Sequence, residues 1–527
     1  MMSRPAAMSD LAIVSTGSIY SSIAASKILE SGGNVADASI VSSLVLSVVQ
    51  NNLCGLGGDL FALIRMKGRV IDLNASGRSS RNISINEYSK RNLDKIPNYG
   101  EMAAITVPGY ISGIDFIHRN YASMDILDLV KPARDLAENG FVVSHNYSDS
   151  INVSEKYLGS YTNWRNIFMP SGNLPAPGSV FKQKDLGNLL SMIMEDGFES
   201  FYNGYVADLI LKGLEGTDVP MDSHDLASHK IIRSEASSVT YGDYRIYATK
   251  PNSQAITSLI WLNILNEQNS GAGKDIKTKE LVESGLAAYE ARRNIIGDPE
   301  RFSFDNYYLG NEYARSLMDR NTSTGVDNTE DVGDTTYFCV ADTEGDALSI
   351  IQSNYMGFGS GIIPARTGFV LQNRGCYFTL DPSHHNCLEP EKRTFHTIGT
   401  ILGEKDKEFA LELGCMGGDI QPQVHIQLLN GMLNRGEDPQ TAIDRPRWAF
   451  PGTIYHRPST LLVEEGLTDG SQDINVSGLT LLTRKGKSSE FGHAQAISTT
   501  KYGTLMGGAD PRGDGIALPL LKRNELH

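Results

Sequence analysis

The feature that most constrains this chain is a polar stretch that ends abruptly at a strand beginning with two threonines. Residues 321–334, NTSTGVDNTEDVGD, have neither helical nor strand periodicity, whereas residues 335–340 are typical of a buried strand. Turn residues at 342–346 and a second strand-like run at 347–352 predict a β-hairpin. We therefore expect Thr335 to lie where a flexible tether enters a sheet.

Thr335 could be a nucleophile if it became the first residue of a chain. A threonine hydroxyl needs a base beside it, and the residue's own α-amine can serve. Cleavage of the Asp334–Thr335 bond would create such an amine, with a pKa of about 7.7 to 8.0. The alternative is that Thr335 and Thr336 reflect only the β-propensity of threonine. The hairpin alone leaves both interpretations open.

Composition narrows the class of protein. The chain has 527 residues and a net charge of −15, which would repel nucleic acid and anionic membranes. Its 5 cysteines are odd in number and lack metal-type CxxC spacing, so we expect neither a disulfide framework nor structural zinc. The amino terminus lacks the apolar core of a signal peptide, and no run approaches a membrane span. We expect a cytoplasmic protein with no nucleic acid or membrane partner.

Helical spacing predicts helices at 18–30, 34–49, 255–265 and 279–296, and strands are predicted at 60–65, 70–73, 239–249, 369–372, 396–402 and 409–414. Residues 157–177 are expected to form an irregular loop. Gly417 and Gly418 lie between a predicted strand and a predicted helix, where backbone N–H groups can face an anion; a tight connection is the simpler interpretation. Adjacent loop histidines such as His384 and His385 rarely converge on one ion, so we predict no metal site and no cofactor.

Together these segments resemble the γ-glutamyltransferase (γ-glutamyltranspeptidase, glutathione hydrolase) family of N-terminal nucleophile hydrolases. The resemblance is carried by SGGNVADASIVSSLVLSVVQ, GLGGDLFALI, VPGYISG, KPARDLAENGF, DTTYFCVADTEGDALS, FGSGI, TGFVLQN and CMGGD, in that order. It implies an α+β fold, a four-layer αββα sandwich. It also implies a proenzyme that cuts itself into a large subunit, residues 1–334, whose tether starts at about 321, and a small subunit, residues 335–527. The two would interleave in one domain, and a homodimer of such heterodimers is compatible with the sequence.

The resemblance also assigns roles to residues of this chain. It makes Asp334–Thr335 the cleavage site, Thr335 the nucleophile and its amine the base. The backbone N–H groups of Gly417 and Gly418 would form the oxyanion hole, which is typically worth several kcal/mol of barrier. Ser353 falls where the family has a threonine that hydrogen-bonds the nucleophile, so a hydroxyl is kept.

The substrate-binding positions depart from the family pattern. Asn74 takes the place of the family's glutamyl-binding arginine, and Arg78 lies four residues further on, roughly 13 Å along an extended strand. Tyr377 replaces the aspartate that holds the substrate's ammonium group. The family's serine pair becomes His396 and Thr397; for His396, a hydrogen-bonded core histidine is the favoured interpretation and substrate contact the alternative.

Arg374 adds a positive charge beside these positions, and it could contact either a substrate carboxylate or a neighbouring carboxylate of the protein. We therefore expect a small amide substrate whose acyl group is γ-glutamyl or a similar group that bears a carboxylate, cleaved through an acyl-Thr335 intermediate. The segment 379–393 is shorter than the family's lid-bearing stretch, so hydrolysis is expected to exceed transfer. The alternatives are an amidohydrolase acting on glutaryl or oxamate-like amides without γ-glutamyl activity, and a catalytically silent binding relative.

Overall fold

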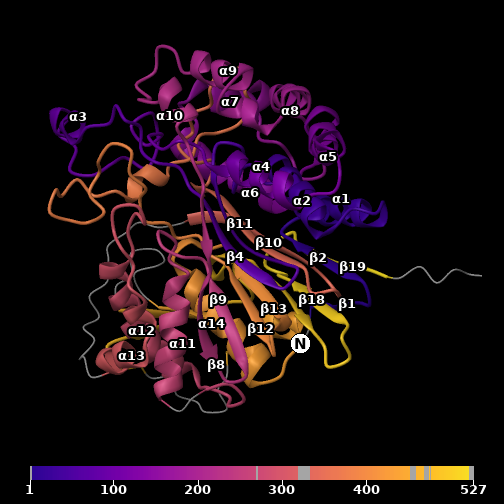
Figure 1. Ribbon diagram of the computed structural model, residues 1–527. Coiled ribbons are helices and arrows are strands. Elements are labelled where there is room, and N and C mark those ends of the chain that lie inside the picture. Colours follow the sequence, from indigo (N-terminus) through magenta and orange to yellow (C-terminus); the bar gives the residue numbers. More distant parts are fainter. Residues whose placement is uncertain are drawn as a thin grey trace, which may run out of the picture.

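Two seven-stranded antiparallel sheets lie face to face, and helices cover the outer face of each (Figure 1). The computed structural model describes residues 3–268, 271–318, 333–450, 459–467, 474 and 476–521. The two sheets, each covered by a helix layer, confirm the predicted four-layer sandwich. The first sheet has the order β1 (Ala7–Ser9), β18 (Leu505–Ala509), β17 (Ala494–Thr499), β13 (Glu408–Cys415), β12 (Ile401–Lys405), β9 (Tyr244–Ala248) and β8 (Ser237–Tyr241). The second has the order β19 (Ile516–Leu520), β2 (Ala12–Thr16), β10 (Gly333–Asp342), β11 (Ala347–Met356), β3 (Asp59–Met66), β4 (Arg69–Ala75) and β7 (Ile232–Glu235).

The helix layer over the second sheet is built mainly from the first half of the chain (Figure 1). Its central helix is α2 (Val35–Val49), in which every residue is buried and whose amino end is closed by a reciprocal cap between Asn34 and Asp37. The other helices of this half are α1 (Ile19–Glu30), α3 (Ile85–Lys90), α4 (Tyr110–Tyr121), α5 (Ile126–Asn139), α6 (His145–Leu158), α7 (Thr162–Phe168), α8 (Lys184–Asp196), α9 (Tyr205–Gly213) and α10 (Ser223–Ala227).

The helix layer over the first sheet joins elements from both halves of the chain. It contains α11 (Ile256–Glu267), α12 (Thr278–Ile295), α13 (Asn311–Met318), α14 (Gln421–Leu429), which continues as one π-helical turn (Asn430–Asn434), and α15 (Pro439–Asp444). Two small sheets lie outside the sandwich: β5 (Phe141–Val142) with β6 (Val180–Phe181), and β14 (Trp448–Ala449) with β15 (Thr460–Glu464) and β16 (Thr480–Arg484).

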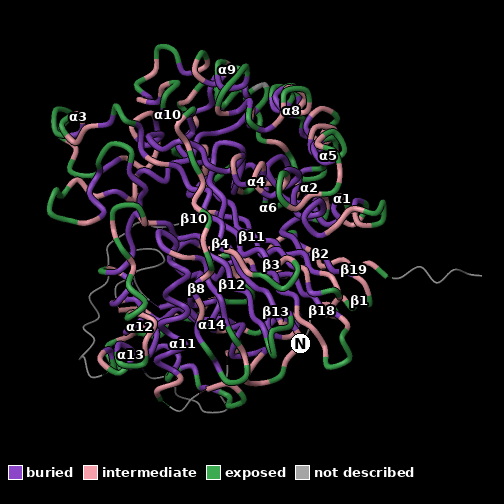
Figure 2. The backbone as a smooth tube through the Cα atoms, viewed as in Figure 1, coloured by how far each residue is buried: buried purple, intermediate pink, exposed green. Residues whose placement is uncertain are grey.

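The central strands, such as β2, β3, β10 and β11, are buried on both faces, which explains why their sequences show little polar alternation (Figure 2). Along β10, Phe338 and Val340 pack into the cluster under the helices, whereas Tyr337 and Cys339 pack into the cluster between the two sheets. Successive strand residues point to opposite faces, so one strand contributes to both cores.

Both sheets contain strands from before and after Asp334. β10 pairs with β2 on one side, and β11 pairs with β3. In the other sheet β12 pairs with β9. The predicted tether from about 321 lies outside the described residues up to 332, and β10 includes both Asp334 and Thr335.

Several predictions of local structure were wrong. The strand predicted at 239–249 is a hairpin, β8 and β9, that turns at Gly242 with φ of +60°. Residues 369–372 belong to neither sheet, because their backbone bonds go to loop residues, as in Gln372 N–H to the Gly57 carbonyl. The predicted loop at 157–177 contains α7, and the strand predicted to start at 396 starts at Ile401.

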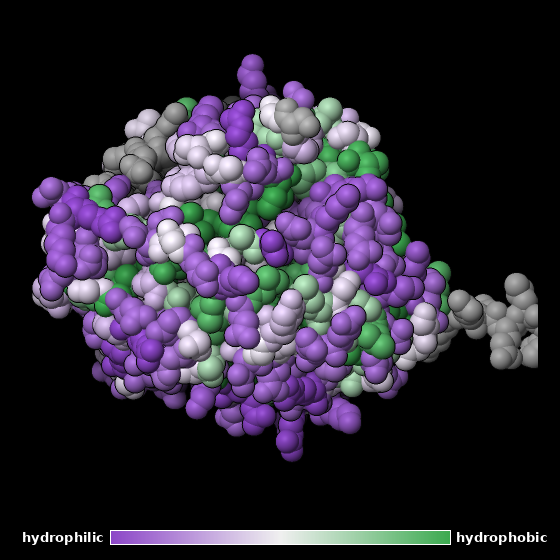
Figure 3. All heavy atoms as spheres, turned by 90° about the horizontal axis from the view of Figure 1, so that it is seen from above, coloured by the Kyte–Doolittle hydropathy of each residue, from purple (hydrophilic) through white to green (hydrophobic). Residues whose placement is uncertain are grey.

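The outer face of the upper helix layer is mostly hydrophilic, and its hydrophobic side chains form small groups (Figure 3). Within the described residues, every helix is too short or too polar to cross a membrane.

Candidate active site

Thr335 lies at an irregular point of the hairpin formed by β10 and β11. Between the pairs Asp334–Tyr355 and Thr336–Gln352 the register shifts, so Thr335 on β10 lies opposite two residues of β11, Ser353 and Asn354, and the bulge is in β11. Its hydroxyl donates a hydrogen bond to Ser353 Oγ at 3.0 Å. Thr335 and Ser353 are each 1% exposed, so this contact is shielded from water.

Ser353 joins the nucleophile candidate to the bond before it. Its hydroxyl donates to the carbonyl oxygen of Asp334 at 2.8 Å, while the backbone N–H of Tyr355 donates to Ser353 Oγ at 2.8 Å. The Ser353 oxygen thus accepts from Thr335 and donates to the carbonyl of the bond predicted to be cut. This arrangement suits attack by a hydroxyl on that carbonyl, because a donor already faces the oxygen that would become negative.

Gly417 and Gly418 lie directly against the segment that enters the cleavage site. They connect β13 to a short 3₁₀ turn (Gly418–Ile420) and have φ of +129° and +57°. A Cβ built on Gly333 would be 2.8 Å from the Cα of Gly418, so the two backbones touch. Within the described part of the chain, the N–H groups of Gly417 and Gly418 donate to no other residue. Both are therefore available to an oxyanion.

Arg374 forms the centre of an aromatic cluster next to this point. It begins a 3₁₀ turn (Arg374–Tyr377), is 1% exposed, and its guanidinium carbon lies 4.1 Å from the ring centre of Tyr355 and 5.5 Å from that of Tyr377. Arg374 Nη1 donates to Thr397 Oγ1 at 3.0 Å. Tyr355 pairs with Asp334 across the hairpin, so one aromatic ring separates Arg374 from the cleavage site.

A buried ion pair supports the far side of this cluster. Arg292 on α12 donates to Asp419 Oδ1 at 2.7 Å, and Tyr377 Oη donates to Asp419 Oδ2 at 3.4 Å. Gln254 Nε2 donates to the Gly418 carbonyl at 2.9 Å, which fixes the glycine pair. Of these residues only Asp419, which follows Gly418 directly, lies in a motif noted from the sequence; Arg292 comes from α12 and Gln254 from the turn before α11.

His396 is buried beside Asp59. His396 Nε2 lies 2.9 Å from Asp59 Oδ2, and both side chains are buried. Asp59 Oδ1 also accepts the N–H groups of Gly77 and Gly109, each at 3.0 Å. Burial, and then the nearby charge of Arg374, lower the pKa of His396 to about 4, so the imidazole is neutral at pH 7. These contacts favour the core-histidine interpretation.

Arg78 and Asn74 are both engaged elsewhere. Arg78 Nη2 pairs with Glu300 Oε2 at 2.6 Å, and Glu300 also pairs with the buried Arg393. Asn74 is buried and donates to Asn252 Oδ1 at 2.8 Å. The structure thus brings Arg374, Tyr377 and Thr397 together, but turns Arg78 toward Glu300.

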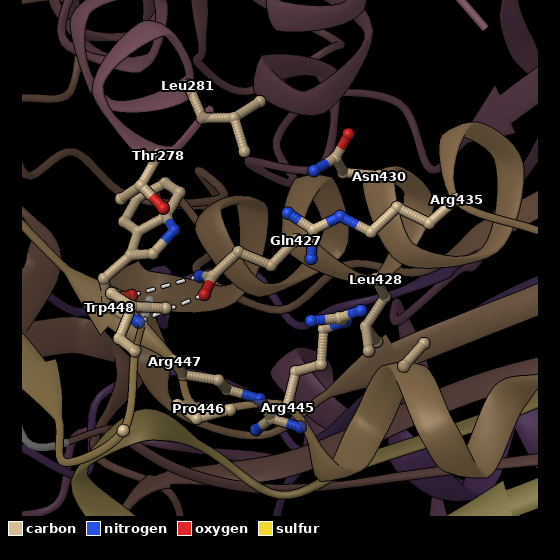
Figure 4. A pocket seen from close by; sticks show the side chains of 13 residues that line it. Thr278, Leu281, Gln427, Leu428, Asn430, Arg435, Arg445, Pro446, Arg447 and Trp448 are labelled. Carbon is tan, nitrogen blue, oxygen red and sulfur yellow. Dashed lines mark hydrogen bonds between the residues drawn. The ribbon is translucent and has the colours of Figure 1, made fainter. Parts of the chain in front are cut away.

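A small pocket of about 60 Å³ between α12, α14 and β14 contains three arginines but is not a second anion site (Figure 4). Arg435 pairs with Asp275, Arg445 with Glu437 and Arg447 with Asp510. Gln427 hydrogen-bonds the backbone of Trp448 at 3.0 and 3.1 Å. The charges in this pocket are therefore neutralised within the protein.

Comparison with known proteins agrees with this geometry. The family model described as "Gamma-glutamyltranspeptidase" matches residues 21–520. The chain is 35% identical to a glutathione hydrolase-like YwrD proenzyme of Bacillus subtilis, covering 94% of this chain and 96% of the relative. It is 30% identical to an oxamate amidohydrolase proenzyme of Klebsiella pneumoniae, covering 93% and 95%.

A solved structure, that of cephalosporin acylase from Bacillus halodurans, superposes with a TM-score of 0.88 at 30% identity, covering 98% of this chain and 97% of that one. The family match extends over nearly the whole chain and includes the Thr335 hairpin and the glycine pair. The chain therefore belongs to the γ-glutamyltranspeptidase family of N-terminal nucleophile hydrolases and acyltransferases.

Proposed function

We propose that this chain cuts itself at Asp334–Thr335 and then hydrolyses small amides whose acyl group carries a carboxylate. The observation that carries the first part is the hydrogen-bonded series from Thr335 through Ser353 to the Asp334 carbonyl. Several relatives are named proenzymes, which supports a precursor that is processed. The products would be residues 1–334 and 335–527, held together by shared sheets.

Processing would begin when Thr335 Oγ1 bonds to the carbonyl carbon of Asp334. The Asp334–Thr335 C–N bond breaks, the nitrogen takes the hydroxyl proton, and water then hydrolyses the resulting ester. Ser353 donates to the oxygen that becomes negative during this attack. The product is a Thr335 with a free amine, which serves as the base for later turnovers.

Turnover would use the same hydroxyl on an external amide. Thr335 Oγ1 attacks the substrate carbonyl, its amine accepts the proton and passes it to the departing nitrogen, and the acyl group remains on Thr335 as an ester. The N–H groups of Gly417 and Gly418 stabilise the negative oxygen. Water then releases the acid.

The acyl preference rests on Arg374. Its guanidinium is buried against Tyr355 and Tyr377, and such a group binds a carboxylate through charge-assisted hydrogen bonds. Tyr377 stands in place of the family's acidic residue, and the nearby carboxylate of Asp419 is already paired with Arg292, so a substrate ammonium loses its family partner. Acyl groups with a carboxylate and no amine, such as glutaryl or oxamyl, fit this composition better than γ-glutamyl. Relatives named for oxamate, cephalosporin and glutathione support a family in which the acyl group varies.

Two measurements test the proposal. Intact mass of wild type and Thr335→Ala, incubated at several pH values, should show fragments ending at Asp334 and starting at Thr335 in wild type only. A single uncut chain in both samples would favour the silent binding relative. Glutaryl-p-nitroanilide should then be cleaved faster than γ-glutamyl-p-nitroanilide, and the reverse order would favour γ-glutamyl substrates.

We also propose that hydrolysis exceeds transfer, because the segment 379–393 is short and leaves the acyl ester open to water. Glycylglycine should therefore change the rate of release of the amine only slightly. A large increase in that rate would contradict this part of the proposal.

A further inference from the structure

The carbonyl groups of the glycine turn are held by side chains that lie far from it in the sequence. Gln254 Nε2 donates to the carbonyl oxygen of Gly418 at 2.9 Å, and Tyr289 Oη donates to the carbonyl oxygen of Asp419. Gln254 lies in the turn before α11 and Tyr289 lies on α12, two helices that pack side by side over the first sheet (Figure 1). The helix layer therefore fixes the backbone that follows Gly417.

This restraint matters because a glycine has no side chain to limit its backbone angles. Gly417 and Gly418 have φ of +129° and +57°. The Gly417 carbonyl accepts from the Ile420 N–H at 3.3 Å, and because a peptide group is planar, this contact also orients the Gly418 N–H. The Gln254 contact fixes the next peptide plane. The two contacts together limit rotation of the backbone about Gly418.

Arg292 determines which way the Gln254 amide points. Arg292 Nη1 donates to Gln254 Oε1 and, at 2.7 Å, to Asp419 Oδ1. A guanidinium has donors only, so the amide oxygen of Gln254 must face Arg292. The amide nitrogen must then face the carbonyl groups of Gly418 and Thr397, as it does. The donor that holds the Gly418 carbonyl thus depends on Arg292.

This network is shielded from water. Gln254, Arg292 and Asp419 are 0%, 6% and 1% exposed. The guanidinium carbon of Arg292 lies 4.5 Å from the ring centre of Tyr289 and 5.3 Å from that of Phe395. A buried ion pair is weak evidence for stabilisation, since apolar side chains of the same volume often serve as well. What distinguishes this pair is its hydrogen-bonded contact, through Gln254, with the glycine turn.

We propose that Gln254 and Arg292 are positioning residues for the oxyanion hole. Arg292 orients the Gln254 amide, and the amide holds the Gly418 carbonyl so that the N–H groups of Gly417 and Gly418 face the reacting carbonyl oxygen. Both residues act through the backbone of Gly418. The inference rests on the proposed amide hydrolysis, in which that oxygen becomes negative when Thr335 Oγ1 bonds to the acyl carbon.

Gln254→Glu tests the inference because it keeps an acceptor for Arg292 but places an oxygen where the donor to the Gly418 carbonyl was. In the processed enzyme it should lower kcat for a glutaryl amide by about 10- to 100-fold, since misplaced oxyanion donors cost about that much. KM should change little, because the glycine pair acts on the transition state rather than on the bound substrate.

Gln183→Glu is the matched control. Gln183 is also buried, its Nε2 donates to the Val48 carbonyl at 2.9 Å and its Oε1 accepts from Asn51, but it lies under the other helix layer. This variant should leave kcat unchanged. Tyr289→Phe is a milder second variant, which removes only the hydroxyl that holds the Asp419 carbonyl. It should lower kcat about threefold or more.

A boronate provides a readout other than turnover. Carboxypropylboronic acid carries the carboxylate of a glutaryl group. Its boron accepts an electron pair from Thr335 Oγ1, the hydroxyl proton passes to the Thr335 amine, and a tetrahedral, negative group forms that resembles the transition state. Gln254→Glu should weaken boronate binding, measured by calorimetry, by the same factor as it lowers kcat. The affinity for glutarate, which forms no such bond, should stay unchanged.

Unchanged kcat and boronate affinity in Gln254→Glu would overturn the positioning role, as would equal losses of affinity for boronate and glutarate. If Gln254→Glu does not fold, the same readouts on Tyr289→Phe decide. Absence of turnover by wild type on glutaryl, oxamyl and γ-glutamyl amides would instead overturn the proposed function, and boronate affinity alone would then decide the positioning role.

Discussion

The guanidinium of Arg374 lies 4.1 Å above the ring of Tyr355, the residue that pairs with Asp334 across the β10–β11 hairpin. Tyr355 has φ of +78°, a conformation that a tyrosine rarely adopts, and this turns its ring toward Arg374 rather than along the strand. A buried cation is thus separated from the cleavage site by one ring. The charge that we propose selects the acyl group and the strand that carries the candidate nucleophile Thr335 are parts of one packed unit.

Arg374→Gln should lower kcat/KM for a glutaryl amide by about 10- to 100-fold, since a hydrogen bond to a charged group is worth about 1.5 to 3 kcal/mol. For the uncharged butyryl amide, the same substitution should lower kcat/KM much less. Rates on the two substrates give the comparison directly. Arg245→Gln, which removes an exposed arginine over Tyr247 in the other sheet, is the control and should leave both rates unchanged. Equal losses on both substrates would assign Arg374 a purely structural role.

Ser353→Ala should slow self-cleavage by about 100-fold, because a donor to the developing oxyanion is lost. Ser353→Thr keeps the hydroxyl and should restore most of the rate. The fraction of uncut chain, followed over time by intact mass, measures both. If Ser353→Ala matures as fast as wild type, Ser353 takes no part in the cleavage.

Gly333→Ala should delay cleavage by about tenfold or more, because its Cβ would press on Gly418 at 2.8 Å and displace the scissile bond. Once cleaved, the variant should have the same kcat as wild type, since residue 333 then belongs to the segment that ends at Asp334. A normal cleavage rate would mean that the contact with Gly418 does not align the bond.

Asp334 should destabilise the uncut chain as pH rises. Burial raises its pKa from 3.8 to about 7, so the folded chain holds a proton that the unfolded chain loses between these values. Stability is therefore lost from pH 4 to pH 7. In a Thr335→Ala background, the free energy of unfolding measured with urea should fall by about 1 to 3 kcal/mol between pH 5 and pH 8. Adding Asp334→Asn should abolish this fall. The same loss in both variants would exclude Asp334 as its source.

His396 should have the opposite effect on stability, lowering the free energy of unfolding as the pH falls. Its pKa falls from 6.5 to about 4 on folding, so the unfolded chain binds the extra proton and stability is lost as pH falls through that window. His396→Gln should reduce the loss of unfolding free energy between pH 7 and pH 4.5 by about 2 kcal/mol. The exposed His145→Gln is the control and should leave the loss unchanged. If His396→Gln loses as much unfolding free energy between pH 7 and pH 4.5 as wild type, other groups cause that loss.

Sequence patterns correctly predicted the helices and strands whose formation depends on residues close by in the sequence. The hairpin at 335–352 was predicted from its turn and its β-branched strands, and α2 from its apolar run with few charges. Residues 369–372 have the composition of a strand, but their partners are loops near Gly57 and Ser360, and composition does not reveal a partner. The short α7 was missed because its helical surface is buried by Phe358, which is distant in sequence.

The sequence by itself determined the threonine pair after a polar stretch, the glycine pair between strand and helix, and through them the family. Only the tertiary structure decided which charged side chains meet there. Arg374 and Arg78 were equal candidates in sequence, yet Arg78 pairs with Glu300 and Arg374 is buried between Tyr355 and Tyr377. The physical reason is that a buried charge is tolerated only where distant segments supply its partners, and those partners are chosen by the packing of the whole chain.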